Sequence, residues 1–293
     1  MDNSKYLFVV NPKAGKKKGL QIFNQILRFA YESKEEDNLS WICTSENKEI
    51  TKRDISCRLK DNPNLTVYSV GGDGTLNDVI NSVDNETRLG IIPIGSGNDF
   101  YRVSSKLKGD RKINLGAVNG RKFINIASLG LDARIADRAN YLKENYKKTL
   151  IYFRAILSVI KDNRPIEYTI NGEKDKSTIL VVGNGKYYGN GVPINPEYDL
   201  SNNYLNIISA PELKDTQIIK FILKALTEKH IDDPMITHYM AKKLNIISNE
   251  ELLCNIDGEI MTSKEFNFEI IEEGITLTND YPRYVKKAIN LIK

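Results

Sequence analysis

This sequence of 293 residues contains few of the residues from which disulfide frameworks and zinc sites are built. Its three cysteines, Cys43, Cys57 and Cys254, are odd in number and lack metal-ligand spacing, which favours a reducing cytosol over secretion. The two histidines, His230 and His238, stand in no motif, which argues against zinc and against histidine-based catalysis. The chemistry is therefore expected to rest on other residue types.

Long hydrophobic runs are also missing. The N-terminal segment has no basic stretch followed by a long apolar one, so no signal peptide is expected. The longest apolar helix candidate, residues 149–160, is far shorter than the roughly 20 residues that a membrane span needs. The composition, 41% hydrophobic and 27% charged, is typical of a globular protein, expected here in the cytoplasm. The net charge of +4 slightly favours anionic partners such as a phosphate compound or an acidic membrane surface, and no nucleic-acid partner is expected.

Two well-known phosphate-binding motifs are absent. A P-loop needs a glycine five residues before Gly15, where Val10 stands, and a serine or threonine after Lys16, where Lys17 stands. No Gly-x-Gly-x-x-Gly segment opens a helix after the first predicted strand, so the dinucleotide-binding fingerprint is missing too. A phosphate site, if present, must have another form.

The stretch 65–83 is a candidate phosphate site of a different kind. A β-branched and aromatic run ends at Gly71 and Gly72, and apolar residues then recur with helical spacing from Leu76, which predicts a strand, a tight turn and a helix. The glycines permit close approach of another molecule, and bare amides at a helix N-terminus bind anions. Taken alone, the turn around Asp73 is as compatible with an ordinary capped helix as with a phosphate site.

The first third of the chain repeats this alternation of strand and helix. Strands are expected at 6–10, 39–43, 65–70 and 88–94, with helices at 20–31 and 46–60 between the earlier ones. The pattern predicts a doubly wound, mainly parallel α/β domain over residues 1–118. Ligands bind outside the carboxyl ends of such strands, and small or polar segments follow all four of them, at 11–16, 44–45, 71–75 and 95–99.

The pattern changes from about residue 112. Alternating runs broken by turn signals, such as the hairpin dipeptide Asn119-Gly120, predict a mostly antiparallel β-sandwich domain over residues 119–281. Helices are expected inside it at 132–147, 149–162 and 216–230. A final helix, within residues 282–293, is expected to pack back on the first domain.

Four motifs in order make the chain similar to a known family. Asn-Pro-Lys-Ala-Gly at 11–15, Gly-Gly-Asp-Gly-Thr-Leu-Asn-Asp-Val-Ile-Asn at 71–81, the segment 92–102 and Asn-Ile-Asp-Gly-Glu at 255–259 resemble the diacylglycerol kinase catalytic-domain family. That family includes bacterial diacylglycerol kinases and the ceramide and sphingosine kinases. The resemblance implies transfer of the γ-phosphoryl group of ATP, with Mg²⁺, to a lipid hydroxyl in a cleft between two domains. Diacylglycerol is the expected acceptor and phosphatidic acid the expected product, in phospholipid metabolism.

The resemblance also implies roles for individual residues. Lys16 is expected near the phosphates, Asp73 at the magnesium, and Glu259 as the general base that accepts the proton of the attacking hydroxyl. Without the family resemblance, Asp73 would be interpreted as a helix cap and Glu259 as a solvated hairpin residue. Asp99 would be interpreted as the cap of a short helix at Phe100. The expected nucleotide-binding residues are Asn11, Pro12, Lys13, Ala14, Gly15, Thr44, Gly71, Gly72, Gly74, Thr75, Ser96 and Asp99.

One segment departs from the family pattern. Related enzymes carry an acidic turn in the second domain that binds a structural magnesium, and here Ser201 and Asn202 replace the acidic pair. Asp199, Asn202 and the carbonyl of Tyr204 remain as candidate ligands, although loss of a carboxylate weakens a site for a hard cation.

The lipid partner implies contact with a membrane. Transient, peripheral binding at the inner face of the membrane is expected, with Lys143, Lys147 and Lys148 as candidates for contacting anionic headgroups. Arg154, the charged residue of an apolar run, either extends to solvent or contacts a phosphate. An edge strand of the second domain offers a surface for a homodimer.

Two other functions remain open at this point. An NAD kinase-like enzyme would share the Gly-Gly-Asp-Gly turn, but the motifs at 11–15 and 96–99 argue against it. A non-catalytic nucleotide- or lipid-binding regulator on the same fold is disfavoured by the retention of Lys16, Asp73 and Glu259.

Overall fold

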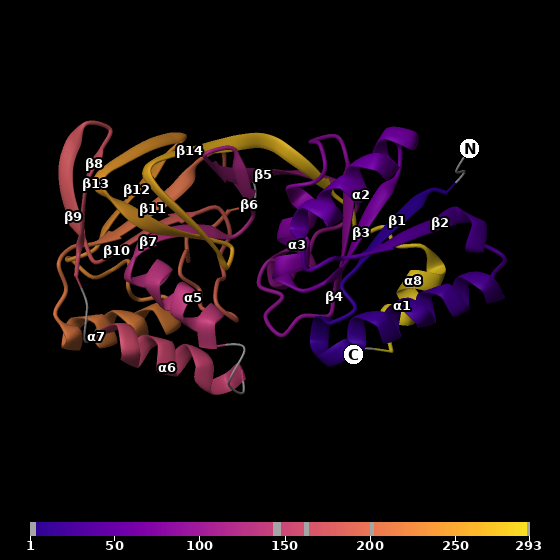
Figure 1. Cartoon of the computed structure of the whole chain (residues 1–293), viewed down its shortest axis with the longest axis horizontal. Helices are drawn as coiled ribbons and strands as arrows, with labels where there is room; N and C mark the ends of the chain where they lie inside the picture. The colour runs from indigo at the N-terminus through magenta and orange to yellow at the C-terminus, as the bar shows by residue number, and fades with distance from the viewer. Residues whose placement is uncertain (1–3, 143–147, 161–163, 200–201, 292–293) are drawn as a thin grey trace. The chain divides into compact units, whose positions relative to one another are not determined.

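The computed structural model describes residues 4–142, 148–160, 164–199 and 202–291, with the backbone alone described for 148–153. The chain divides into two compact units (Figure 1). Unit 1 comprises Met1–Asn114 and Glu272–Lys293, and unit 2 comprises Leu115–Ile271. Strands β5 (Arg111–Val118) and β14 (Glu259–Leu277) each run from one unit into the other.

Unit 1 contains a parallel sheet with the strand order β4-β3-β1-β2. Every residue of β3 is buried, as expected for an inner strand covered on both faces. The last residues of β14, Thr276 and Leu277, add to the outer side of β4, also in parallel. The predicted parallel α/β fold is therefore confirmed. The strands are β1 (Tyr6–Val10), β2 (Leu39–Cys43), β3 (Thr66–Gly71) and β4 (Arg88–Pro93).

Helices cover both faces of this sheet. Phe8 and Val70, on one face, share a hydrophobic core with Phe23 of α1 and Val285 of α8. Helices α2 and α3 pack against each other, and Figure 1 shows them on the opposite face from α1 and α8. The bounds are α1 (Ala14–Glu32), η1 (Glu36–Asn38), α2 (Lys48–Asp61), α3 (Asp73–Ile80), α4 (Tyr101–Ser104) and α8 (Arg283–Ile289).

Unit 2 contains antiparallel strands in the order β12-β11-β10-β7-β13-β14, and the predicted β-sandwich class is confirmed. The dipeptide Asn119-Gly120, with φ angles of 49° and 79°, makes the predicted tight hairpin between β5 and β6. The further strands are β6 (Arg121–Phe123), β7 (Ile126–Gly130), β8 (Ile166–Ile170), β9 (Glu173–Ser177), β10 (Ile179–Gly183), β11 (Leu205–Ala210), β12 (Thr237–Ala241) and β13 (Lys243–Ile256).

The strands of unit 2 differ in places from those that the local sequence pattern predicts. The sequence pattern predicted no strand at β9 or β12. Strand β9 consists mostly of exposed charged residues, and β12 has no alternation of buried apolar and exposed polar residues. The sequence contains two separate apolar runs, at 244–247 and 252–256, which form one strand in the structure, β13, with a register shift between Ile247 and Leu252. Pairing with the long neighbour β14 on both sides of this shift aligns the two runs as one strand.

Three helices belong to unit 2. Helices α5 (Leu131–Leu142), α6 (Lys148–Ile160) and α7 (Asp215–Leu226) contribute to one hydrophobic core together with β7, β10 and β11. Figure 1 shows the three helices along one side of the unit 2 sheet. Within the described part of the chain, no helix combines the length and the apolar character needed to cross a membrane.

Candidate functional site

The polar segments that follow the strands of unit 1 lie next to one another at one edge of its sheet. Asn11, just after β1, donates from its backbone N to the Val70 carbonyl at 3.0 Å, and Thr44, just after β2, donates to the Val10 carbonyl at 2.8 Å. After β4, the Ile94 N–H donates to the Gly71 carbonyl at 2.7 Å. The four predicted loops are thus held together by main-chain hydrogen bonds.

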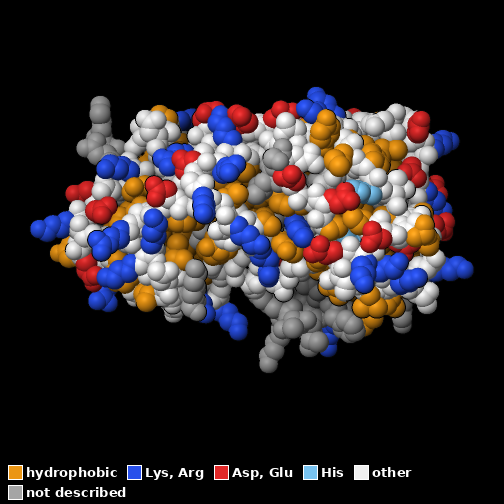
Figure 2. Space-filling view, turned by 180° about the vertical axis from the view of Figure 1, so that it is seen from behind, with side chains coloured by type: hydrophobic (Ala, Val, Ile, Leu, Met, Phe, Trp, Pro, Cys, Tyr) orange, Lys and Arg blue, Asp and Glu red, His pale blue; other side chains and the backbone are white. Residues whose placement is uncertain are grey.

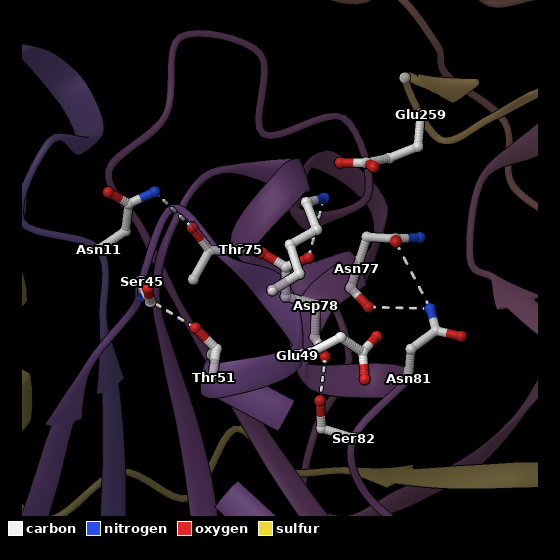
Figure 3. A network of polar contacts seen from close by, with 12 residues as sticks. Asn11, Ser45, Glu49, Thr51, Thr75, Asn77, Asp78, Asn81, Ser82 and Glu259 are labelled. Carbon is white, nitrogen blue, oxygen red and sulfur yellow. Dashed lines mark hydrogen bonds and ion pairs between the residues drawn. The ribbon is translucent and has the colours of Figure 1, made fainter. Parts of the chain in front are cut away.

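Asn11 and Thr75 connect two of these loops through their side chains. Asn11 Nδ2 donates to Thr75 Oγ1 at 3.1 Å (Figure 3). Thr75 is 2% exposed and lies in the first turn of α3, so its hydroxyl is fixed from the β1 side. This contact brings together two residues that the sequence predicted at the nucleotide.

The backbones of Gly72 and Gly95 are in close contact. A Cβ atom on Gly95 would stand 2.6 Å from the Cα of Gly72, a distance at which the backbone would have to shift. Asn98, which has a positive φ of 51°, donates from Nδ2 to the Gly95 carbonyl at 2.9 Å and holds the loop after β4. Gly74 differs, because a Cβ there would meet nothing within 4 Å. Packing therefore requires Gly72 and Gly95, whereas the space beside Gly74 is open.

The loop after β1 has unusual backbone geometry. Gly15, Lys16 and Lys17 have φ angles of 57°, 60° and 73°, so a left-handed turn lies inside the start of α1. Such angles cost non-glycine residues on the order of 1–3 kcal/mol each and gather at functional sites. The ammonium group of Lys16 is exposed, and that of Lys13 forms an ion pair with Glu46 beyond β2. Lys16, the residue predicted to lie near the phosphates, is therefore exposed on a turn with a strained backbone.

Two acidic residues of the predicted site occupy different settings. The N-cap of α3 is Gly72, and Asp73 is the first helical residue, half-buried, where its charge is favoured by the helix dipole. Asp99 is 5% exposed, and its Oδ1 lies 3.7 Å from Nε of Arg102. The N-cap of the short helix α4 is Phe100, and the ion pair with Arg102 joins Asp99 to the first turn of that helix.

Sequence reasoning missed several polar residues beside this edge. Lys48, the first residue of α2, forms an ion pair with Asp78 of α3 at 3.1 Å. Asn77 is 1% exposed, and its backbone carbonyl accepts a hydrogen bond from Asn81 Nδ2 at 3.0 Å (Figure 3). Asp73, Asn77 and Asn81 recur every four residues, and that spacing places them on one helix face, a signal that was available from the sequence.

Glu259 of unit 2 follows a firmly anchored turn. The Asp257 carboxylate accepts the backbone N–H groups of Ile124, Asn125 and Ile126 at 2.7, 3.0 and 3.0 Å, and Asp257 and Gly258 both have positive φ. Glu259 Oε2 lies 3.2 Å from Arg121 Nη2, and each side chain is 28% exposed. Glu259 is therefore an oriented, half-buried carboxylate and not a fully solvated hairpin residue.

The candidate structural-metal segment shows a looser arrangement. The backbone N of Asn202 donates to the Asp199 carbonyl at 3.1 Å, Asp199 is exposed, and Lys242 Nζ lies 5.5 Å from the ring centroid of Tyr204. Among the described residues, no three or more histidines, cysteines or acids form a group that could hold a metal. Asp199 offers one carboxylate with amide and carbonyl oxygens, a weak set for a hard cation. This site stays a prediction.

Three predicted lysines fall outside what the structure describes. Lys143 and Lys147 lie outside the described residues, as does Ser201, and the side chain of Lys148 is not described. Arg154 of α6 is exposed. Ser96 is exposed as well, in the loop after β4.

Comparisons with known proteins match both units. The protein-family model described as "Diacylglycerol kinase catalytic domain" matches residues 5–126. A second family model, described as "YegS C-terminal NAD kinase beta sandwich-like domain", matches residues 125–278. The chain is 27% identical over 214 residues to the diacylglycerol kinase of Bacillus subtilis (strain 168), covering 66% of this chain and 70% of that protein. It is also 27% identical over 231 residues to a diacylglycerol kinase of Staphylococcus epidermidis, covering 72% of this chain and 73% of the other.

Solved structures show the same fold. A crystal structure of a diacylglycerol kinase from Bacillus anthracis (strain Sterne) superposes with a TM-score of 0.62 at 21% identity, covering 96% of this chain and 98% of that one. Another chain from the same organism gives a TM-score of 0.70 at 24% identity, with 97% of each chain covered. At these identities the structural likeness shows the fold alone.

Proposed function

The chain belongs to the diacylglycerol kinase catalytic-domain family, with a YegS-type C-terminal β-sandwich domain, and from this membership we propose that it is an ATP-dependent lipid kinase. The family resemblance predicted from four motifs is confirmed. We propose further that the acceptor is a lipid hydroxyl, that diacylglycerol is the preferred acceptor, and that phosphatidic acid is the product.

The observation that carries this proposal is the joined edge of unit 1. Asn11, Thr75 and the Gly72–Gly95 contact hold three loops against the start of α3, where backbone amides lie at a helix N-terminus. Amides of this kind, with the open space beside Gly74, suit a chain of phosphates. Lys16 supplies positive charge for them, and Thr44 and Ser96 lie in the neighbouring loops.

Phosphoryl transfer needs positioning and charge neutralisation more than covalent help from the protein. In our proposal Asp73 would hold the magnesium, because a half-buried carboxylate at the first turn of a helix is chemically suited to a hard cation. Magnesium, when bound, neutralises charge on the phosphates. Glu259 accepts the proton of the lipid hydroxyl, the hydroxyl oxygen forms a bond to the γ-phosphorus, and the bond to ADP breaks.

A radiolabel assay tests this function. The purified chain is incubated with γ-labelled ATP, Mg²⁺ and separate acceptors: diacylglycerol, ceramide, sphingosine and NAD. We expect label in phosphatidic acid and no label in NADP. Label in NADP would support the NAD kinase-like alternative, and ATP binding without transfer to any acceptor would support a non-catalytic regulator. Label in another lipid would keep the kinase but replace the acceptor.

We also propose that the chain meets its acceptor at the membrane surface, as a transient peripheral protein of the cytoplasmic face. On the face shown in Figure 2, basic and acidic side chains lie interspersed. Sedimentation with vesicles of neutral lipid, or with vesicles that also contain anionic lipid, tests this. Equal binding to the two would remove the electrostatic part of the proposal. A homodimer stays a separate proposal, tested by light scattering.

A further inference from the structure

The ion pair between Arg121 and Glu259 joins two segments of unit 2 that are far apart in the sequence. Arg121 Nη2 lies 3.2 Å from Glu259 Oε2, and both side chains are partly exposed. Among the described residues, Glu259 is the acid with which Arg121 pairs. The proposed function gives Glu259 the role of the base and leaves Arg121 without one.

The position of Arg121 is fixed by a tight hairpin. Arg121 directly follows the Asn119-Gly120 turn and pairs with Val118 across it. Further along β6, Phe123 is 0% exposed and pairs with Gly116 of β5, where a Cβ would stand 2.2 Å from the Phe123 ring. A larger residue at Gly116 would displace this ring, so the two strands pack in one register. The backbone of Arg121 is therefore held in place.

The residues after β6 hold the turn that precedes Glu259. The Asp257 carboxylate accepts the N–H groups of residues 124–126, and the Asp257 N–H donates to the Ile126 carbonyl at 3.0 Å. Asn140 Nδ2 of α5 donates to the Gly258 carbonyl at 3.1 Å. One continuous segment, residues 121–126, thus carries Arg121 and also grips the turn that carries Glu259.

These contacts hold the turn without help from the ion pair. An ion pair between partly exposed side chains contributes only about 0–1 kcal/mol to stability. A general base, in contrast, must present an oxygen within hydrogen-bond distance of the hydroxyl proton. The guanidinium group engages Glu259 Oε2 and so limits rotation of the carboxyl group. The ion pair therefore orients the side chain of Glu259, which the main-chain contacts leave to rotate.

The charge of Arg121 also suits a proton transfer. Partial burial disfavours the ionised form of a carboxyl group, and an opposite charge at this distance favours it. The neighbouring carboxylate of Asp257 is itself stabilised by three main-chain N–H groups. When Glu259 accepts the proton of the lipid hydroxyl, it becomes neutral, whereas the guanidinium group keeps its charge. That positive charge then favours the negative charge on the attacking oxygen until its bond to phosphorus forms.

We propose that Arg121 is a positioning residue for the base: it keeps Glu259 ionised and orients its carboxylate for the acceptor hydroxyl. The proposal rests on the proposed lipid kinase function for the reaction itself. Because Arg121 acts through Glu259, its loss should affect use of the acceptor and not the binding of ATP. The ionisation of Glu259 is measurable without ATP or lipid.

The first experiment measures Glu259 in the absence of substrates. Carbon NMR of protein with isotope-labelled glutamate side chains follows the titration, and the Glu259 signal is identified by its loss in Glu259→Gln. In Arg121→Gln this carboxyl group should titrate at a pH higher by about one unit or more, because the opposite charge is gone. Lys243→Gln removes a cation that pairs with Glu269 of the same strand and should leave the titration of Glu259 unchanged.

Equal titration of Glu259 in Arg121→Gln and in the wild type overturns the inference. Arg121→Gln is expected to keep a melting temperature near that of the wild type, since the turn has other anchors. Should it unfold, Arg121→Met, which keeps the apolar stem of the side chain, gives the same comparison.

The second experiment follows catalysis over a range of pH. Arg121→Gln should lower kcat with diacylglycerol by roughly tenfold to 10²-fold, as misplacement of a catalytic group does. The acidic limb of kcat/KM for the lipid should move to higher pH, while KM for ATP stays unchanged. Arg121→Lys keeps the charge without the forked geometry, so it should retain the wild-type acidic limb with an intermediate kcat. A lower kcat without a shift of the acidic limb in Arg121→Gln indicates a structural role and overturns the inference.

Failure of this inference is distinguishable from failure of the proposed function. A shifted titration of Glu259 in Arg121→Gln, without phosphorylation of any lipid, would keep the effect of Arg121 on Glu259 and reject the kinase. Lipid phosphorylation with an unshifted titration in Arg121→Gln would keep the kinase and reject the role of Arg121.

Discussion

Asn11 donates a hydrogen bond from Nδ2 to Thr75 Oγ1 across 3.1 Å, although 64 residues separate them in the chain. The contact joins the loop after β1 to the first turn of α3, and Thr75 is almost completely buried. The side chain of Thr75 also lies where a Cβ on Gly71 would stand. The two motifs that predicted the nucleotide site are therefore parts of one packed unit.

Breaking this hydrogen bond should weaken both the fold and the nucleotide site. Asn11→Ala and Thr75→Val are each expected to cost about 1–3 kcal/mol of unfolding free energy, because a buried polar group loses its partner. The double variant should cost less than the sum of the two. Urea denaturation and ATP titration measure these effects, and Thr75→Ser, which keeps the hydroxyl, is the control. Additive costs would show that the two residues act independently.

Two glycines of the site should respond in opposite ways to a methyl group. Gly95→Ala is expected to destabilise unit 1 by about 1–3 kcal/mol, because its Cβ would stand 2.6 Å from Gly72 Cα. Gly74→Ala should keep or raise stability by roughly 0.5–1 kcal/mol, since the site is open and helical. If phosphates occupy that open space, Gly74→Ala will still weaken ATP binding. Unchanged ATP affinity in a stable Gly74→Ala protein would place the phosphates elsewhere.

Removing the charge of Asp73 should damage catalysis more than folding. Asp73→Asn is expected to lower kcat by roughly 10²–10³, comparable to loss of one electrostatic stabiliser, while the melting temperature changes little because the residue is half-buried at a helix start. Asp215→Asn replaces the matching first-turn acid of α7 and should leave kcat unchanged. Kinetics over a range of Mg²⁺ concentrations measure the effect. Full activity in Asp73→Asn would refute a role at the metal.

Glu259 should be needed for the proton-transfer step. Glu259→Gln keeps the shape of the side chain but cannot accept the proton, and kcat should fall by roughly 10²–10⁴ with KM for ATP unchanged. Glu269→Gln, on the same strand and paired with Lys243, should behave like the wild type. Steady-state assays with a saturating acceptor separate the two variants. Equal loss in both would indicate damage to β14 and not loss of a base.

His230 should make the protein less stable in mild acid. Burial lowers the pKa of His230 below its ordinary 6.5, and Nε2 is already hydrogen-bonded to the Ile194 carbonyl at 2.8 Å. The unfolded chain therefore takes up a proton first, so unfolding free energy falls as pH drops below 6.5, by at most about 1.4 kcal/mol per pH unit. Urea denaturation at several pH values measures this. His230→Gln should remove that part of the slope.

Nuclear magnetic resonance provides an independent check on His230. The ring protons should titrate below pH 6.5 in the folded protein. The expected cause is that a second proton would go to Nδ1, which is buried and has no hydrogen-bond partner among the described residues. Titration at or above 6.5 would contradict the direction of the shift.

The sequence by itself determined the elements whose signals are local. The buried runs at β1 and β3, the glycines at 71–72 and the Asn119-Gly120 hairpin follow from period, turn chemistry and backbone freedom, all of which depend on near neighbours. Four ordered motifs were sufficient for the family. Strands β9 and β12 were not predicted because their mostly exposed residues lack a buried apolar alternation and form strands through pairing with β8 and β11.

Tertiary structure alone decided the contacts between distant residues. It placed Gly72 against Gly95, paired Lys48 with Asp78, and paired Arg121 with Glu259. Each of these contacts depends on how strands and helices pack, because side chains far apart in sequence become neighbours only when their elements are in register. The left-handed turn at Lys16 has the same origin: packing holds it, and its own residue types oppose it.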